Sequence, residues 1–251
     1  MMTIATKLCG ATALVSAGLL LSSGCAVTGT SDAAPSASTT SAHATTTARA
    51  DQLLLNSAEF PSGSSMLGVS EKSVVSGFSN ASGTSNNNGV QGPLTVNPAE
   101  CASAQQDLTN LLQQLTQNAS FAGAQQGDGT VFTEIISNTA ADLAKVSDSV
   151  TRCGQMTLTT TVLGKQVTTT TVSTESLPLP DQTNGLGAVA YRTTSQSELN
   201  GNSAATNSYT GYALVDSITV AVHAENLTGT SDESTFENLF GTAVQKVRDA
   251  T

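Results

Sequence analysis

The feature that most constrains the fold is a change of period at Met156. From there, apolar side chains recur at every second position and alternate with threonine and serine, which is typical of strands with one buried face. Short turns around Gly164, Asn200 and Asp216 separate these segments, so consecutive strands must pair antiparallel. The predicted strands are 156–162, 167–173, 188–195, 207–215 and 217–225.

The segments before and after this meander show helical spacing or a hairpin signal. Asp128-Gly129 supplies a turn for a hairpin over 121–137, and Val and Leu predict a strand over 66–75, whereas 77–91 is predicted to be a loop. Helices are expected over 49–56, from Asn97 as N-cap with Pro98 at the first helical position, over 140–150, and over 234–249.

Together these elements predict the fold class. Strands in meander with a few separate helices are typical of an α+β domain, here a multi-stranded antiparallel sheet with the helices packed on one face. The terminal helix carries a continuous apolar stripe, so we expect it to cover the sheet. The length that remains after the N-terminal segments suits one domain, over 51–251.

The N-terminus predicts export and lipid anchoring. A short basic start and an apolar run up to Leu21 lead to Ser22-Ser23-Gly24-Cys25, which is typical of a lipoprotein signal peptide over 1–24 with Cys25 as the acylated residue. Residues 25–50, rich in Thr, Ser and Ala, then form a tether. Because Ser22 occupies a position usually held by leucine, an ordinary signal peptide cut near Ala26 is the alternative.

The charge balance excludes one class of partner. The chain has 9 Lys and Arg against 19 Asp and Glu, and a formal net charge of −10. Nucleic acid is excluded because phosphate binding needs a basic surface. The same acidity disfavours adsorption to an anionic membrane, so we expect the lipid on Cys25 to provide the attachment to the cell membrane, on its extracytoplasmic face.

The four cysteines have different expected fates. Cys9 leaves with the signal and Cys25 takes the lipid, which leaves Cys101 and Cys153 as one pair in an oxidising compartment. A disulfide between them is predicted. The alternative, a pair of reactive thiols, lacks a C-x-x-C spacing and a nearby histidine.

Several of these features together resemble a known family. With the signal, the Thr/Ser tether, Phe60-Pro61-Ser62-Gly63, Pro98-Ala99-Glu100-Cys101 and an amphipathic terminal helix, the chain resembles actinobacterial, including mycobacterial, cell-envelope lipoproteins. Their domain is similar to the extracytoplasmic sensor domain of the mycobacterial receptor kinase PknH. The resemblance implies a sheet backed by helices, a cleft for a small ligand and no catalytic residues. The chain departs from that domain in having one cysteine pair and no tryptophan.

Few residues could support chemistry. Only His43, in the tether, and His223 could serve a triad or a zinc site, so no catalytic site, metal site or cofactor is predicted. Tyr191, Tyr212 and His223 are bulky side chains with polar ends on the strands, which makes them the candidate ligand-binding residues. His223 is expected on the sheet face opposite Ile218, Val220 and Val222.

Two function classes follow. In the first, the chain is a non-enzymatic binding or sensor-like lipoprotein with a cleft for a small apolar or glycan ligand. In the second, it is a structural lipoprotein with a filled core that contacts envelope proteins. A hydrolase that uses His223 is a third and weaker hypothesis.

Overall fold

The computed structural model describes residues 50–75, 94–162, 165–199, 202–226 and 232–251. They all belong to one compact unit, which runs from Thr39 to Thr251. The predicted signal peptide, Cys25, the tether up to residue 49 and the loop over 77–91 lie outside the described residues. Among the described residues, no helix has both the length and the apolar character needed to cross a bilayer.

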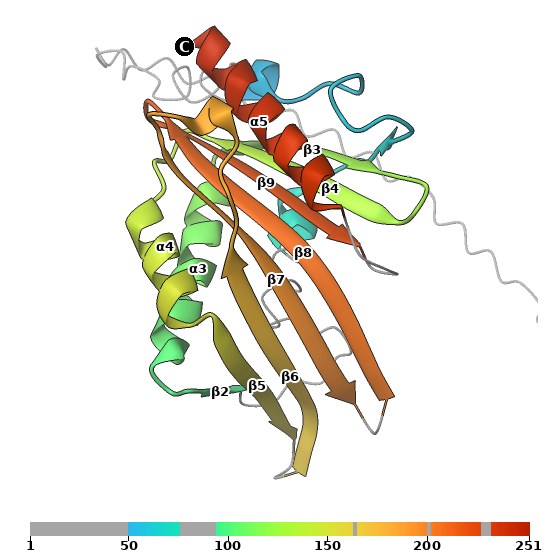
Figure 1. Cartoon of the computed structure of the whole chain (residues 1–251), viewed down its shortest axis with the longest axis vertical. Helices are drawn as coiled ribbons and strands as arrows, with labels where there is room; N and C mark the ends of the chain where they lie inside the picture. The colour runs from blue at the N-terminus through green and yellow to red at the C-terminus, as the bar shows by residue number, and fades with distance from the viewer. Residues whose placement is uncertain (1–49, 76–93, 163–164, 200–201, 227–231) are drawn as a thin grey trace, which may run out of the picture. The chain divides into compact units, whose positions relative to one another are not determined.

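A nine-stranded sheet organises the domain (Figure 1). Every neighbouring pair of strands is antiparallel, as the sequence predicts, and the order across the sheet is β1-β3-β4-β9-β8-β7-β6-β5-β2. The strands are β1 (Ser65–Met66), β2 (Leu94–Asn97), β3 (Ala119–Gln125), β4 (Thr130–Ser137), β5 (Gln155–Val162), β6 (Lys165–Ser176), β7 (Gly187–Leu199), β8 (Asn202–Val215) and β9 (Ile218–Asn226).

The predicted turns at Asp128-Gly129 and Asp216 are confirmed, whereas those at Gly164 and Asn200 lie outside the described residues. β3 and β4 form the hairpin at Asp128-Gly129, where Gly129 has φ +91° and the Asp128 carboxylate accepts a hydrogen bond from the Thr130 N–H at 2.8 Å. Asp216, between β8 and β9, has φ 53°, a conformation that short polar residues tolerate better than branched ones. These local signals therefore fix both connections.

Helices lie on both faces of the sheet, so the prediction that they share one face is wrong. α5 (Glu233–Ala250) packs on β8 and β9 over one face, whereas α3 (Cys101–Thr116) and α4 (Leu143–Arg152) cover the other (Figure 1). β9 is buried at all nine positions. Val220 and Val222 face α5, and Ala221 faces α3 and α4, because successive side chains of a strand point to opposite faces and β9 lies inside the sheet, between β4 and β8.

Two predicted assignments in the first half of the chain also change. The segment predicted as a strand over 66–75 contains only the end of β1, and residues 71–75 are helical. Ser70 starts this turn: its hydroxyl accepts from the Ser73 N–H at 3.3 Å, and the Ser73 hydroxyl oxygen accepts from the Ser70 N–H at 2.8 Å, a reciprocal cap. Asn97 ends β2, and α3 starts at Cys101, beyond the predicted N-cap.

α5 packs closely on the sheet and confirms the predicted terminal helix. Asp232 caps it through hydrogen bonds from the Ser234 and Thr235 N–H groups. A Cβ atom added to Gly211 of β8 would come within 2.9 Å of the Phe240 ring. The glycine therefore allows the α5 phenylalanine to lie directly against the strand.

Candidate functional site

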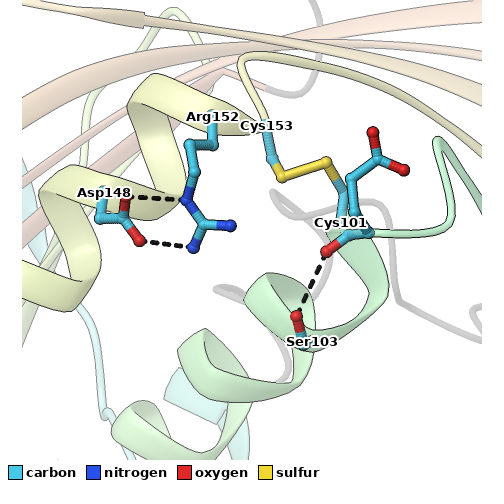
Figure 2. Close-up of a disulfide and its surroundings, with 6 residues drawn as sticks. Cys101, Ser103, Asp148, Arg152 and Cys153 are labelled. Carbon is cyan, nitrogen blue, oxygen red and sulfur yellow. Dashed lines mark hydrogen bonds and ion pairs between the residues drawn. A yellow bond between two sulfur atoms is a disulfide. The ribbon is translucent and has the colours of Figure 1, made fainter.

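The Cys101–Cys153 disulfide joins the start of α3 to the end of α4, as predicted (Figure 2). The two Cα atoms are 5.7 Å apart and the residues are 52 positions apart in the chain. Both cysteines are buried. The bridge therefore fixes the spacing of the two helices over the sheet.

A cavity of about 50 Å³ lies beneath this bridge, between the helix pair and strands β5 to β8. Helices α3 and α4 supply its roof, and the strands supply its floor. Because a water molecule needs on the order of 10–15 Å³ of such space, the cavity has room for about four. Its lining residues are Cys101, Ala104, Gln105, Leu108, Ser149, Val150, Cys153, Met156, Val172, Thr174, Tyr191, Thr193 and Thr210.

The cavity lining carries no charged side chain. Its polar groups are hydroxyls and one amide, that of Gln105, whose residue is 6% exposed. The Gln105 Nε2 atom has no hydrogen-bond partner within the described part of the chain. A buried donor left in this state costs free energy, so an acceptor that enters the cavity would be stabilised there.

The three residues predicted as ligand contacts lie on one sheet face, joined through Thr210. Tyr191 pairs with Thr210 across β7 and β8, and Thr210 pairs with His223 across β8 and β9. Tyr191 hydrogen-bonds both Tyr212 and Thr210, and the Thr210 hydroxyl lies 3.0 Å from Nδ1 of His223. The Tyr191 and Tyr212 ring centroids are 6.5 Å apart.

Only Tyr191 of these three lines the cavity directly. Tyr212 and His223 are buried behind it, 4% and 3% exposed. His223 is on the face opposite Val220 and Val222, as the alternation predicts. The face was thus predictable, whereas the contact between Thr210 and His223 depends on the strand register and was missed.

Burial keeps this network uncharged at neutral pH. Burial lowers the pKa of His223, and a hydrogen bond with the Tyr209 backbone raises it by less, so the resulting pKa is about 4. It also raises the pKa of Tyr191 and of Tyr212, so both phenols keep their protons. The cavity floor therefore presents neutral hydroxyl groups rather than an ionised acid or base.

Gln105 was not among the residues predicted from the sequence. The residue follows Cys101 by four positions and precedes Leu108 by three, so helical spacing alone places it on the buried stripe. A polar side chain at a stripe position is the signal that could have identified it. Its neighbour Gln106 is exposed and donates to the Asn110 side chain at 2.9 Å, which shows how one helical position separates the two amides.

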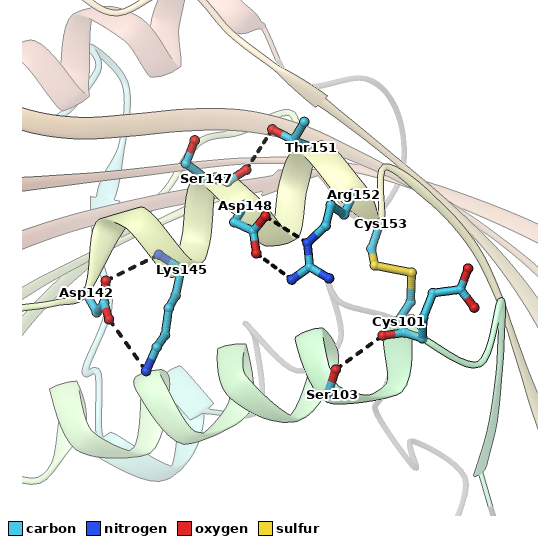
Figure 3. Close-up of polar contacts among 10 residues, drawn as sticks. Cys101, Ser103, Asp142, Lys145, Ser147, Asp148, Thr151, Arg152 and Cys153 are labelled. Atoms are coloured by element: carbon cyan, nitrogen blue, oxygen red, sulfur yellow. Dashed lines mark hydrogen bonds and ion pairs between the residues drawn. A yellow bond between two sulfur atoms is a disulfide. The ribbon is translucent and has the colours of Figure 1, made fainter.

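Four charged side chains of α4 and its N-cap form two exposed ion pairs (Figure 3). Arg152 donates to Asp148 through Nε at 2.7 Å, and Lys145 lies 3.5 Å from Asp142. All four side chains are more than half exposed. In the described ranges, no group of three or more His, Cys, Asp or Glu side chains could hold a metal ion.

Comparisons with known proteins give structural neighbours only. No protein-family model matches the chain, and no curated protein matches it. A crystal structure of an uncharacterised protein from Mycobacterium smegmatis is similar at 16% identity and a TM-score of 0.45, over 79% of this chain and 96% of that chain.

The extracellular domain of PknH from Mycobacterium tuberculosis is also similar. The identity is 18% and the TM-score 0.38, over 81% of this chain and 94% of that domain. The expected resemblance is therefore matched by a structural similarity at low identity, while lipidation and an actinobacterial origin stay predictions. The functional proposal rests on the residues of the chain itself.

Proposed function

We propose that the chain is a lipid-anchored, extracytoplasmic binding module of the sensor-like kind, which takes a small ligand in the cavity beneath the Cys101–Cys153 bridge and performs no chemistry on it. The observation that carries the proposal is the cavity itself, which lies between two helices tied by a disulfide and a sheet floor. A preformed space of this kind limits the ordering cost of binding.

The neutral floor supports binding rather than catalysis. His223 is 3% exposed and its pKa is lowered to about 4, so it is a weak base, buried behind the lining. The hydroxyl at hydrogen-bond distance from it is that of Thr210, at 3.0 Å. Under this proposal the pair helps to position Tyr191, which does line the cavity.

Native mass spectrometry of the protein released gently from the membranes of the cells that produce it tests the proposal. We expect a bound molecule that is lost in Ala104→Leu, because Ala104 is buried in the α3 wall and the larger side chain fills the space. Ala102→Leu, at an exposed position of the same helix, is the matched control and should retain the molecule. A thermal melt establishes that both variants are folded.

The size of the cavity favours a second candidate function. Pockets for drug-sized ligands typically measure roughly 300–1,000 Å³, well above the about 50 Å³ found here. A structural lipoprotein with a nearly filled core, which contacts envelope proteins through its surface, is therefore the alternative. Wild-type protein that carries no adduct, together with an Ala104→Leu variant of raised stability, would favour that alternative over a binding module.

A further inference from the structure

We propose that the ligand of this cavity is a small uncharged molecule with a carbonyl or ether oxygen, and that this oxygen accepts a hydrogen bond from Nε2 of Gln105. The inference rests on the proposed binding function and specifies its ligand class. It makes Gln105, on α3, the residue that determines specificity.

The absence of charge from the cavity lining excludes an ionic ligand. An ammonium or a carboxylate would lose its hydration there without meeting a counter-charge, which costs several kcal/mol or more. Asp148 and Arg152, on the nearby outer side of α4, already neutralise each other and are absent from the lining. A neutral molecule with an apolar body avoids this cost and contacts the lining of Leu108, Val150 and Val172.

The amide of Gln105 then determines where the polar atom of the ligand lies. A glutamine side chain offers two donors on Nε2, and this atom is buried without a partner among the described residues. The Thr210 and Tyr191 hydroxyls are already hydrogen-bonded to each other, and Thr210 also contacts His223. Of the described lining residues, Gln105 is thus the one with a buried side-chain atom that needs an acceptor.

The experiment uses three probes built on one five-membered ring, which differ only in polarity. Cyclopentanone presents an acceptor, cyclopentane presents none, and cyclopentylammonium carries a charge. Each is titrated into ¹⁵N-labelled protein, with the side-chain amide resonances of Gln105 and Gln106 followed by NMR. We expect cyclopentanone to shift the Gln105 amide, to bind about 3- to 10-fold more tightly than cyclopentane, and cyclopentylammonium not to bind.

Gln105→Leu and Gln106→Leu form the matched pair of variants. Gln105→Leu should weaken cyclopentanone about 3- to 10-fold and leave cyclopentane unchanged or tighter, because it removes the donor and keeps an apolar wall. Gln106→Leu, which alters an exposed amide on the same helix, should behave like the wild type. Removal of an unpaired buried amide should raise the melting temperature of Gln105→Leu, which confirms that this variant folds.

Different results would contradict the role of Gln105, the neutral ligand class and the binding function. Equal affinity for cyclopentanone and cyclopentane in the wild type, or an unchanged cyclopentanone affinity in Gln105→Leu, would overturn the assigned role of Gln105 and leave the binding function intact. Preferred binding of cyclopentylammonium would overturn the neutral ligand class. If none of the three probes binds, the assigned ligand class is wrong, and if native mass spectrometry also finds no adduct, the binding function is wrong as well.

Discussion

Glu134 of β4 is a fully buried carboxyl group in the core beneath α5. Its Oε2 accepts a hydrogen bond from the Leu55 N–H at 2.7 Å, and its Oε1 has no partner within the described ranges. Burial raises the pKa of Glu134, and this hydrogen bond and the charge of Lys246 lower it by less, so the resulting pKa is about 8. Lys246 binds the Leu54 carbonyl and Glu59 instead, at 2.7 and 2.6 Å.

A pH-dependent stability follows from this burial. Because the folded pKa of Glu134 lies above its ordinary value of 4.5, its contribution is complete below pH 4.5 and is lost as the pH rises to about 8. The loss is on the order of 5 kcal/mol. Urea unfolding at several pH values should show this loss in the difference between the wild type and Glu134→Gln, with the variant the more stable of the two at pH 8.

The control for Glu134→Gln removes a carboxylate that is exposed instead of buried. Glu198 is an exposed residue of β7, so Glu198→Gln should keep the pH dependence of the wild type. A wild-type free energy of unfolding that is flat between pH 6.5 and 8, where the His223 contribution is already complete, or a Glu134→Gln curve parallel to that of the wild type, would contradict the buried-acid account.

The pH dependence of stability that His223 contributes has the opposite sign. Its folded pKa, about 4, lies below the ordinary value of 6.5, so its contribution is complete above pH 6.5 and is lost as the pH falls to about 4. The loss is about 3 kcal/mol. Because Glu134 acts in the opposite direction over an overlapping range, the test is made in a Glu134→Gln background.

In that background, His223→Gln should remove the loss of stability between pH 6.5 and 4, measured by urea unfolding. The same variant tests the hydrolase hypothesis. An esterase or amidase turnover that disappears with His223→Gln, while the fold persists, would contradict a non-catalytic role for this residue.

At the scale of elements, the sequence was sufficient wherever the cause is local. The Asp128-Gly129 turn, the period-two strands from Met156 and the apolar stripe of α5 are each determined by neighbouring residues, and all three predictions are confirmed. The pairing of β4 with β9 places β9 inside the sheet, between β4 and β8, and it depends on contacts between distant segments. Nothing local predicts that pairing, so the second helical face was missed, and with it the place of the expected cleft beneath α3 and α4.

The contact between α5 and β8 gives a prediction at this scale. Gly211→Ala should destabilise the domain by about 1–3 kcal/mol, because the added methyl group meets the Phe240 ring at 2.9 Å in a packed core. Chemical denaturation measures the change. Gly127→Ala is the control, since its Cβ would meet nothing within 4 Å. Phe240→Leu should relieve part of the clash, and a fully additive double variant would argue against direct contact.

The disulfide gives a second prediction for the elements. Replacement of Cys101 and Cys153 together by alanine should lower the free energy of unfolding by about 4 kcal/mol, since the bridge closes a loop of 52 residues. It should also weaken cyclopentanone binding, because α3 and α4 lose the link that sets their spacing above the cavity. Non-reducing peptide mapping of the wild type must recover the linked pair, and two alkylatable thiols would refute the bridge.

At the scale of the whole molecule, charge and attachment must be considered together. The net charge of −10 becomes −11 if the predicted signal, with Lys7, is removed. Such a protein is repelled by an anionic membrane surface rather than held on it. We therefore predict that acyl chains on Cys25 hold the membrane-bound form, and its attachment should resist high salt, which screens only electrostatic contacts.

Cys25→Ser tests this attachment with a matched control from the same region. Without the thiol no lipid can be attached, so the variant should leave the washed membrane fraction and the detergent phase, whereas Cys9→Ser, which removes a cysteine of the predicted signal, should stay with both. Mass spectrometry of the wild type should find an N-terminal peptide that begins at an acylated Cys25. A Cys25→Ser protein that remains on membranes after a high-salt wash would exclude the lipid anchor, and cleavage near Ala26 would favour an ordinary exported domain.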